Sequence, residues 1–222
     1  MALACAERSD LADLLVALEP EKWDAPSLCS EWRVRDVVAH MFSYDPLSKG
    51  DLVRRFLAGR LNGDRVNALG VAVYGRCTID ELLALVKEHI QPRGLAAGFG
   101  GRIALIDGLI HHQDIRRALG LPREVPAERL RRALQFAPTA PPIHARKRIR
   151  ALSFVATDLD WRMGTGLSVE GPAEAVLMAI AGRPASLPEL SGPGVETLAA
   201  RLTTPTCPPG RSAISSATPR SA

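Results

Sequence analysis

Two residues that can bind a metal or move a proton, Asp107 and His111, lie four positions apart in GRIALIDGLIHHQDIRRALG, residues 101–120. In a helix this spacing places carboxylate and imidazole one above the other. Asp114 lies in the same sector one turn later, whereas His112 projects to the opposite side. Such a pair can hold one divalent metal. It is also typical of a histidine at a core margin that is hydrogen-bonded to the aspartate, and this helix alone favours that second interpretation.

The stretch itself has the pattern of an amphipathic helix that ends at Gly120, which can adopt the left-handed cap conformation. Its apolar positions fall on one stripe at helical spacing: Ile103, Ile106, Leu109 and Ile110. The sequence therefore predicts a helix that is buried along one side.

A second candidate imidazole, His40, lies at the margin of the apolar stripe in a helix predicted over 31–44, EWRVRDVVAHMFSY. Ser30 is its predicted N-cap. Asp36 lies four residues before His40. It is either a partner that orients the imidazole or a first-turn acid stabilised by the helix dipole, and the sequence leaves both open.

Two further amphipathic helices are predicted at 7–19 and 79–91, with a less regular helical arm at 50–70 between the second and third helices. Four such helices joined by turns indicate an antiparallel bundle, in which metal sites are built from inward side chains of facing helices. His89, near the end of its helix, is interpreted as structural, because an imidazolium there suits the dipole.

After Pro122 the pattern changes, and residues 123–148 contain one short helix, AERLRRALQF, and a proline-rich connector. A strand in RIRALSFVATDLDW, a strand LSVEG and helices in PAEAVLMAIAG and GVETLAARL then predict a small α+β domain over 149–202. Such a block is too small for an independent core, so we expect it to pack on the bundle and form a cleft with it. Residues 203–222 are predicted to be disordered.

The composition, 46% hydrophobic and 23% charged over 222 residues, is that of a globular protein with one large or two small domains. No apolar run reaches the ~20 residues that span a bilayer, and the acidic start does not resemble an export signal. Four scattered cysteines indicate reduced thiols and a cytoplasmic location. The arginines between 129 and 150 are not interleaved with aromatic residues, so nucleic-acid binding is not favoured.

Four segments carry a resemblance to a known family: WDAPSLCSEWRVRDVVAHM, LIHHQDIRRALGLP, VATDLDWRMGTG and EGPAEAVLMAIAGR. They resemble the mycothiol-dependent maleylpyruvate isomerase family, one of the DinB-like metal-binding four-helix bundles, in order and over most of residues 7–202. The resemblance implies a mainly α fold, with a DinB-like four-helix bundle at 1–122 followed by the small α+β C-terminal domain.

The resemblance also implies one divalent metal, typically zinc, held by a histidine that ends a DVVAH-type motif and by an acid and a histidine spaced ExxxH. The matching residues are His40, Asp107 and His111. Two imidazoles and a carboxylate with an open fourth position suit a catalytic zinc. Asp107 stands where the family has glutamate, and the side chain shorter by one methylene leaves open a tighter, a water-completed or a weaker site.

The same resemblance places an arginine of the C-terminal domain at the active site, and the matching position is Arg183. Its guanidinium would hold a substrate carboxylate by a bidentate fork, or alternatively it caps the carbonyls of the preceding helix. Cys29 is predicted not to be a nucleophile, because it precedes the second helix and is expected to lie away from the metal ligands.

The chemistry that the resemblance implies depends on mycothiol, a small thiol that a bound metal would ionise. The thiolate adds to an activated double bond and leaves after rotation, or is transferred to an electrophile. The chain is thus expected to be an isomerase or thiol transferase for a small-molecule substrate such as maleylpyruvate. Two alternatives remain: a non-catalytic DinB-like metal-binding protein, and a basic protein that contacts nucleic acid.

Overall fold

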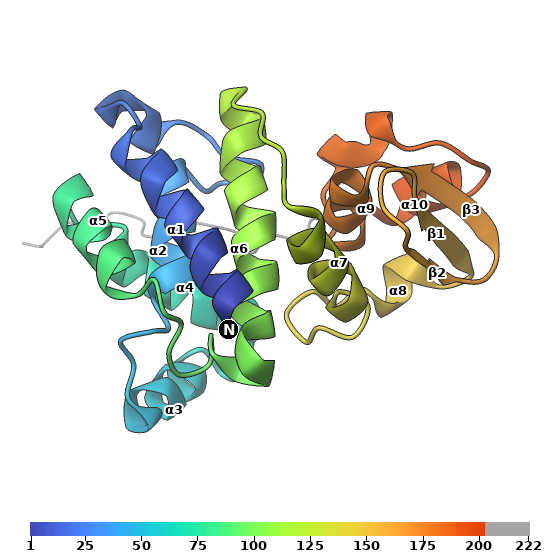
Figure 1. The fold of residues 1–222 in the computed structure, drawn as a ribbon. Helices are drawn as coiled ribbons and strands as arrows, with labels where there is room; N and C mark the ends of the chain where they lie inside the picture. The colour runs from blue at the N-terminus through green and yellow to red at the C-terminus, as the bar shows by residue number, and fades with distance from the viewer. Residues whose placement is uncertain (203–222) are drawn as a thin grey trace, which may run out of the picture.

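Two parts of the chain lie side by side in the computed structural model, which describes residues 1–202 (Figure 1). The first part is a helical bundle. It consists of α1 (Ala2–Val16), the 3-10 helix η1 (Pro20–Asp24), α2 (Val34–Phe42), α3 (Lys49–Ala58), α4 (Gly63–Tyr74), α5 (Ile79–Glu88) and α6 (Gly98–Leu119). The tail predicted to be disordered, 203–222, lies outside the described residues.

The second part is smaller and contains a short sheet. It consists of α7 (Ala127–Phe136), α8 (Arg146–Ile149), β1 (Leu152–Ala156), β2 (Arg162–Gly164), β3 (Leu167–Gly171), α9 (Ala173–Ile180), the 3-10 helix η2 (Pro184–Glu189) and α10 (Val195–Leu202). The prediction of a mainly α fold, with a four-helix bundle followed by a small α+β part, is confirmed.

The bundle is closed by four helices, because α1 and α2 each pack against both α5 and α6. Its core contains Leu11 and Leu15 of α1, Val38 of α2, Leu82 of α5 and Ile115 of α6. The residues of α1, α2 and α5 are positions that the amphipathic patterns place on the apolar stripes, whereas Ile115 lies outside the stripe predicted for α6. The irregular arm predicted at 50–70 is a pair of helices, of which α4 packs on α2 while α3 packs on α4 and has no fully buried residue.

Helix α6 is the shared wall of two cores, and the prediction that it is buried along one side is wrong. Every residue from Gly108 to Ile115 is buried, which is more than two turns and therefore the whole circumference. The bundle packs on one flank through α1 and α2, and α7 packs on the other. Consequently the polar residues in the middle of α6 must find partners inside the protein.

The ends of α6 and the start of α2 show how local sequence sets the helices. Gly101 has φ 87, so regular helix begins only after it, and Gly120 ends the helix with φ 67, as predicted. The predicted N-cap Ser30 is wrong, because α2 begins at Val34 and Asp36 Oδ2 accepts a hydrogen bond from the backbone N–H of Arg33 at 3.1 Å. Of the two open roles of Asp36, the structure shows that of a first-turn acid.

In the second part, strands follow the order β2-β1-β3, with β1 antiparallel to β2 and parallel to β3. The single strand predicted in 148–161 is shorter, and β2 was not predicted because three residues are too few for a periodic signal. Phe154 of β1 pairs with Val169 of β3, both fully buried, and α9 covers this face. Helix α7, within the predicted connector, packs on both α6 and α9.

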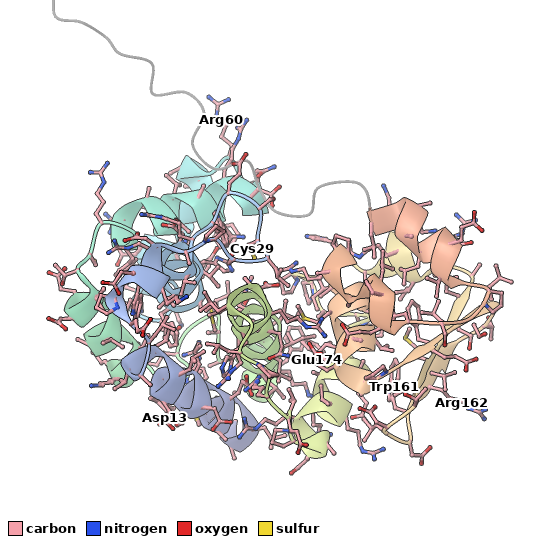
Figure 2. All side chains as sticks on the ribbon, turned by 90° about the horizontal axis from the view of Figure 1, so that it is seen from above. Asp13, Cys29, Arg60, Trp161, Arg162 and Glu174 are labelled. Atoms are coloured by element: carbon pink, nitrogen blue, oxygen red, sulfur yellow. The ribbon has the colours of Figure 1, made fainter. Side chains whose placement is uncertain are left out.

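The two parts are joined by charged side chains as well as by apolar packing. Arg117 of α6 donates to Glu189 Oε1 at 2.6 Å and, through Nε, to Glu174 Oε1 of α9 at 3.0 Å. Glu174 lies at the junction of the two parts in Figure 2. No helix in the described part of the chain combines the length and the apolar character needed to cross a membrane.

Candidate metal centre

His40 of α2 and Asp107 and His111 of α6 converge where these two helices pack together. The Asp107 Oδ1 atom lies 3.7 Å from His40 Nε2 and 3.5 Å from His111 Nε2, and the three donor atoms all lie within 4.8 Å of one another. The imidazole rings stand nearly perpendicular, at 80°, with centroids 4.9 Å apart. The structure thus brings together all three residues that the sequence singled out as a ligand set.

His40 is held by aromatic neighbours and lacks an ordinary hydrogen-bonding partner. Its ring packs against Trp32, with centroids 4.9 Å apart, and meets the ring of Tyr44 edge-on. The buried Nδ1 atom has no hydrogen-bond partner in the described part of the chain. Burial holds the pKa of His40 below its ordinary value although Asp107 raises it, which favours the neutral imidazole that a metal requires.

These residues fit a divalent metal. Two imidazole nitrogens and one carboxylate oxygen are a common ligand set of catalytic zinc, which keeps a fourth position open. The observed 3.5 and 3.7 Å are close to the separation of about 3.4 Å expected between two ligands of a tetrahedral ion at about 2.0–2.1 Å. The Asp107 side chain is 25% exposed and His111 10%, so the set is open to solvent on the aspartate side.

The other nitrogen of His111 faces a buried carboxylate. Nδ1 donates to Asp114 Oδ2 at 2.9 Å and Nε2 faces Asp107. Burial alone would lower the pKa of His111, but Asp107 and Asp114 hold it above its ordinary value. Asp114 is fully buried and also accepts from Arg183, from Nε at 2.9 Å and Nη2 at 2.7 Å. Burial alone would raise the pKa of Asp114, but Arg183 and His111 hold it well below its usual range. Asp114 is therefore an anion that fixes the His111 ring.

Arg183 contacts a carbonyl at the end of α9, which is one of the two roles that the sequence left open, and it also binds a carboxylate of the protein itself. Its Nη1 donates to the carbonyl of Ala181 at 3.3 Å, at the end of α9, while its Nε and Nη2 hold Asp114. The side chain is 11% exposed, and the carboxylate of Asp114 links it to His111. A substrate carboxylate would therefore meet a guanidinium whose fork already contacts Asp114.

The expectation that Cys29 lies away from the ligand layer is wrong. Its Sγ lies 3.7 Å from His111 Nδ1 and donates to Asp114 Oδ2 at 3.1 Å, because the loop before α2 folds onto α6. The backbone N–H of Leu28 fixes this loop by donating to the carbonyl of Asp114 at 3.1 Å. Cys29 (labelled in Figure 2), His111 and Asp114 form a second group of possible ligands, but the Arg183 cation already neutralises Asp114 there.

His112 faces the other side of α6, as predicted. It is fully buried, with Nδ1 donating to Glu7 Oε1 at 2.9 Å and Nε2 accepting from Arg116 Nε at 2.9 Å. Glu7 also binds Arg129, one of the arginines considered for nucleic acid, at 2.9 Å. His89 is buried and donates from Nδ1 to the carbonyl of Leu85, so its contact is internal to the helix end.

Residues 4–93 match the family model described as the mycothiol maleylpyruvate isomerase N-terminal domain. The similarity to this family therefore covers the N-terminal helices of the chain. His40 lies within the matched segment, whereas Asp107 and His111 follow it.

Two solved structures share the fold of this chain. A crystal structure of the mycothiol-dependent maleylpyruvate isomerase matches with a TM-score of 0.53 at 13% identity, covering 86% of this chain and 90% of that one. A crystal structure of a histidine-to-alanine mutant of that isomerase matches with a TM-score of 0.51 and the same identity and coverage. None of the curated proteins compared matches the chain. The structural likeness therefore extends through both parts of the chain.

Proposed function

We propose that the chain is a metal-dependent enzyme that uses a low-molecular-weight thiol, mycothiol, to isomerise a small electrophilic substrate such as maleylpyruvate or to transfer the thiol to it. The observation that carries the proposal is the convergence of His40, Asp107 and His111 on one point in a bundle similar to this family. A divalent metal held there, zinc being the ion that the ligand set suits best, would ionise a coordinating thiol.

The chain's own residues prepare this site in two ways. Asp114 accepts a hydrogen bond from His111 Nδ1 and so leaves Nε2 as the nitrogen that faces the site, where a metal would displace the proton that Asp107 and Asp114 favour. Burial of His40 favours its neutral form, so both imidazoles can act as ligands. Thiol and substrate would approach from the side of Asp107, whose side chain is the most exposed of the three.

Arg183 is proposed to serve the same site from the C-terminal part. Its guanidinium spans both oxygens of Asp114, a geometry that a lysine ammonium cannot reproduce. Through Asp114 it supports the orientation of His111. Contact with a substrate carboxylate requires that one of its donors be shared with, or released from, Asp114.

The deciding experiment is metal analysis of the purified chain together with turnover of maleylpyruvate in the presence of mycothiol. We expect about one metal ion per chain, loss of metal and turnover in His40→Ala, and no change in His144→Asn. His144 is a matched control because it is an exposed histidine, and asparagine tolerates its φ of 51. Equal metal content in His40→Ala and the parent chain would overturn the metal assignment.

The same preparation separates the enzyme from a non-catalytic metal-binding bundle. Full metal occupancy without turnover under any thiol would favour the non-catalytic alternative. Asp107→Glu then restores the residue that the family pattern carries. Activity gained in that variant would show that the shorter carboxylate of Asp107 had removed the reaction and left the metal site.

A further inference from the structure

A second candidate site lies at the junction of the two parts of the chain. It is a pocket of about 350 Å³ between the end of α6, the loop before α2 and η2, to which Gln113, Leu28 and Ala185 respectively contribute. This volume falls at the lower end of the range for small-molecule sites, which begins at about 300 Å³. The pocket is not lined by His40, Asp107 or His111, so it is distinct from the candidate metal centre.

Most arginines near this pocket are paired with carboxylates. Arg117, which lines it, binds Glu174 and Glu189. Arg123, a short distance along the chain, binds Glu7 at 2.5 Å. The charge of these two side chains is therefore already compensated within the protein.

Arg116 also lines the pocket and differs from them. Among residues 1–202 no carboxylate lies within ion-pairing distance of its guanidinium. Its contacts are neutral: Nε donates to His112 Nε2 at 2.9 Å and Nη1 to the carbonyl of Leu121 at 3.4 Å. Burial lowers the pKa of Arg116 and the charge of Arg123 lowers it further, whereas Glu7 and Asp10 raise it from beyond ion-pairing distance. A half-buried cation that no carboxylate of residues 1–202 contacts directly favours an anion from outside the chain.

Gln113 supplies further donors at the same pocket. Its Oε1 accepts from Arg123 Nε at 3.1 Å, and because arginine only donates, the amide oxygen is fixed on that side. The amide N–H groups are thus left for another acceptor. Gln113 and Arg116 are three residues apart on α6 and so lie on one face of the helix.

The rest of the lining consists of Gly120 and four apolar residues, Leu28, Leu121, Pro122 and Ala185. We propose that this pocket binds a small organic acid, whose carboxylate accepts hydrogen bonds from Arg116 and Gln113 and whose apolar body packs on Leu28, Pro122 and Ala185. The site goes beyond the proposed function, since it requires neither the metal nor the thiol. A cation beside an apolar wall selects a carboxylate with a hydrocarbon body over an inorganic anion.

The experiment is titration of the full chain with 4-fluorobenzoate, followed by fluorine NMR, with 4-fluorobenzamide as the uncharged probe of the same shape. The chain is first treated with a chelator, so that a carboxylate bound to a metal cannot contribute. We expect the binding of 4-fluorobenzoate to the parent chain to saturate by about 10 mM. The affinity should be about tenfold lower in Arg116→Gln, and the amide probe should bind the parent chain about tenfold more weakly than the acid. Arg132→Gln is the matched control, because Arg132 is exposed on α7 and does not line the pocket. It should bind as the parent chain does.

A second variant keeps the test decisive if Arg116→Gln unfolds. Leu121 is 36% exposed, so the fold should tolerate Leu121→Glu. The new carboxylate would lie beside Arg116 and should lower the affinity for the probe about as much as Arg116→Gln does. Three results would overturn the proposal: no binding to the chelator-treated parent chain, parent-like binding by the variants that fold, or equal affinity for acid and amide. Because metal content and turnover are not measured, failure here leaves the metal-centre proposal unaffected.

Discussion

Replacement of Asp114 by asparagine tests the arrangement that holds His111. The carboxylate accepts hydrogen bonds from His111, Cys29 and twice from Arg183, and it is fully buried while the Arg183 side chain is 11% exposed. Asp114→Asn keeps the shape but removes the charge and turns an N–H donor toward other donors. Loss of one partner of a buried ion pair costs about 3–5 kcal/mol of unfolding free energy.

The same change should weaken metal binding, because the carboxylate that orients a ligand histidine contributes about 10- to 100-fold to metal affinity. Urea unfolding at pH 7 gives the first quantity, and competition with a chromophoric chelator gives the second.

Asp10→Asn is the matched control for this substitution. Asp10 binds Arg129 at 2.5 Å, but its side chain is 45% exposed, so a loss of at most about 1 kcal/mol is expected. If Asp114→Asn resembled Asp10→Asn in stability and left chelator competition unchanged, Asp114 would not be holding His111, and the role assigned to Arg183 would fail with it.

Three further outcomes are expected. Arg183→Lys should lower kcat/KM about tenfold, which corresponds to about 1.4 kcal/mol of lost transition-state stabilisation. A rise in KM with unchanged metal content indicates that Arg183 contacts the substrate, whereas loss of metal indicates that it supports His111. Burial lowers the pKa of His112, so its stabilising contribution is present above its unfolded pKa of about 6.5 and is lost as the pH falls, at up to about 1.4 kcal/mol per pH unit. In His112→Gln this part of the acid dependence of urea unfolding should disappear. Cys29→Ser should retain turnover and metal content, because a hydroxyl can still donate to Asp114; abolished turnover with intact metal would make Cys29 the nucleophile.

Local patterns were sufficient for the helices, whereas the candidate ligand set came from the family resemblance. Periodicity of 3.6 residues located α1, α2, α5 and α6, and the family-like spacing pointed to His40, Asp107 and His111. The same reasoning separated His111 from His112, since neighbouring residues on a helix differ by about 100° in direction. Sequence reasoning was less successful at helix starts. At the start of α2 the side chain of Asp36, and not that of Ser30, accepts the capping hydrogen bond.

What the sequence determined by itself is thus local: which segments are helical and which face each side chain occupies. The three candidate metal ligands were an expectation from the family resemblance, and the structure brings them together. The tertiary structure decided the surroundings. Arg183 reaches Asp114 across 69 residues, and Cys29 reaches His111 across 82, through packing of segments whose patterns are independent of each other. Helix α6 is buried on all sides for the same reason. A periodic apolar stripe predicts only the partner that covers this stripe. The elements that pack on the polar face of α6 are stabilised by paired charges, which periodicity does not detect.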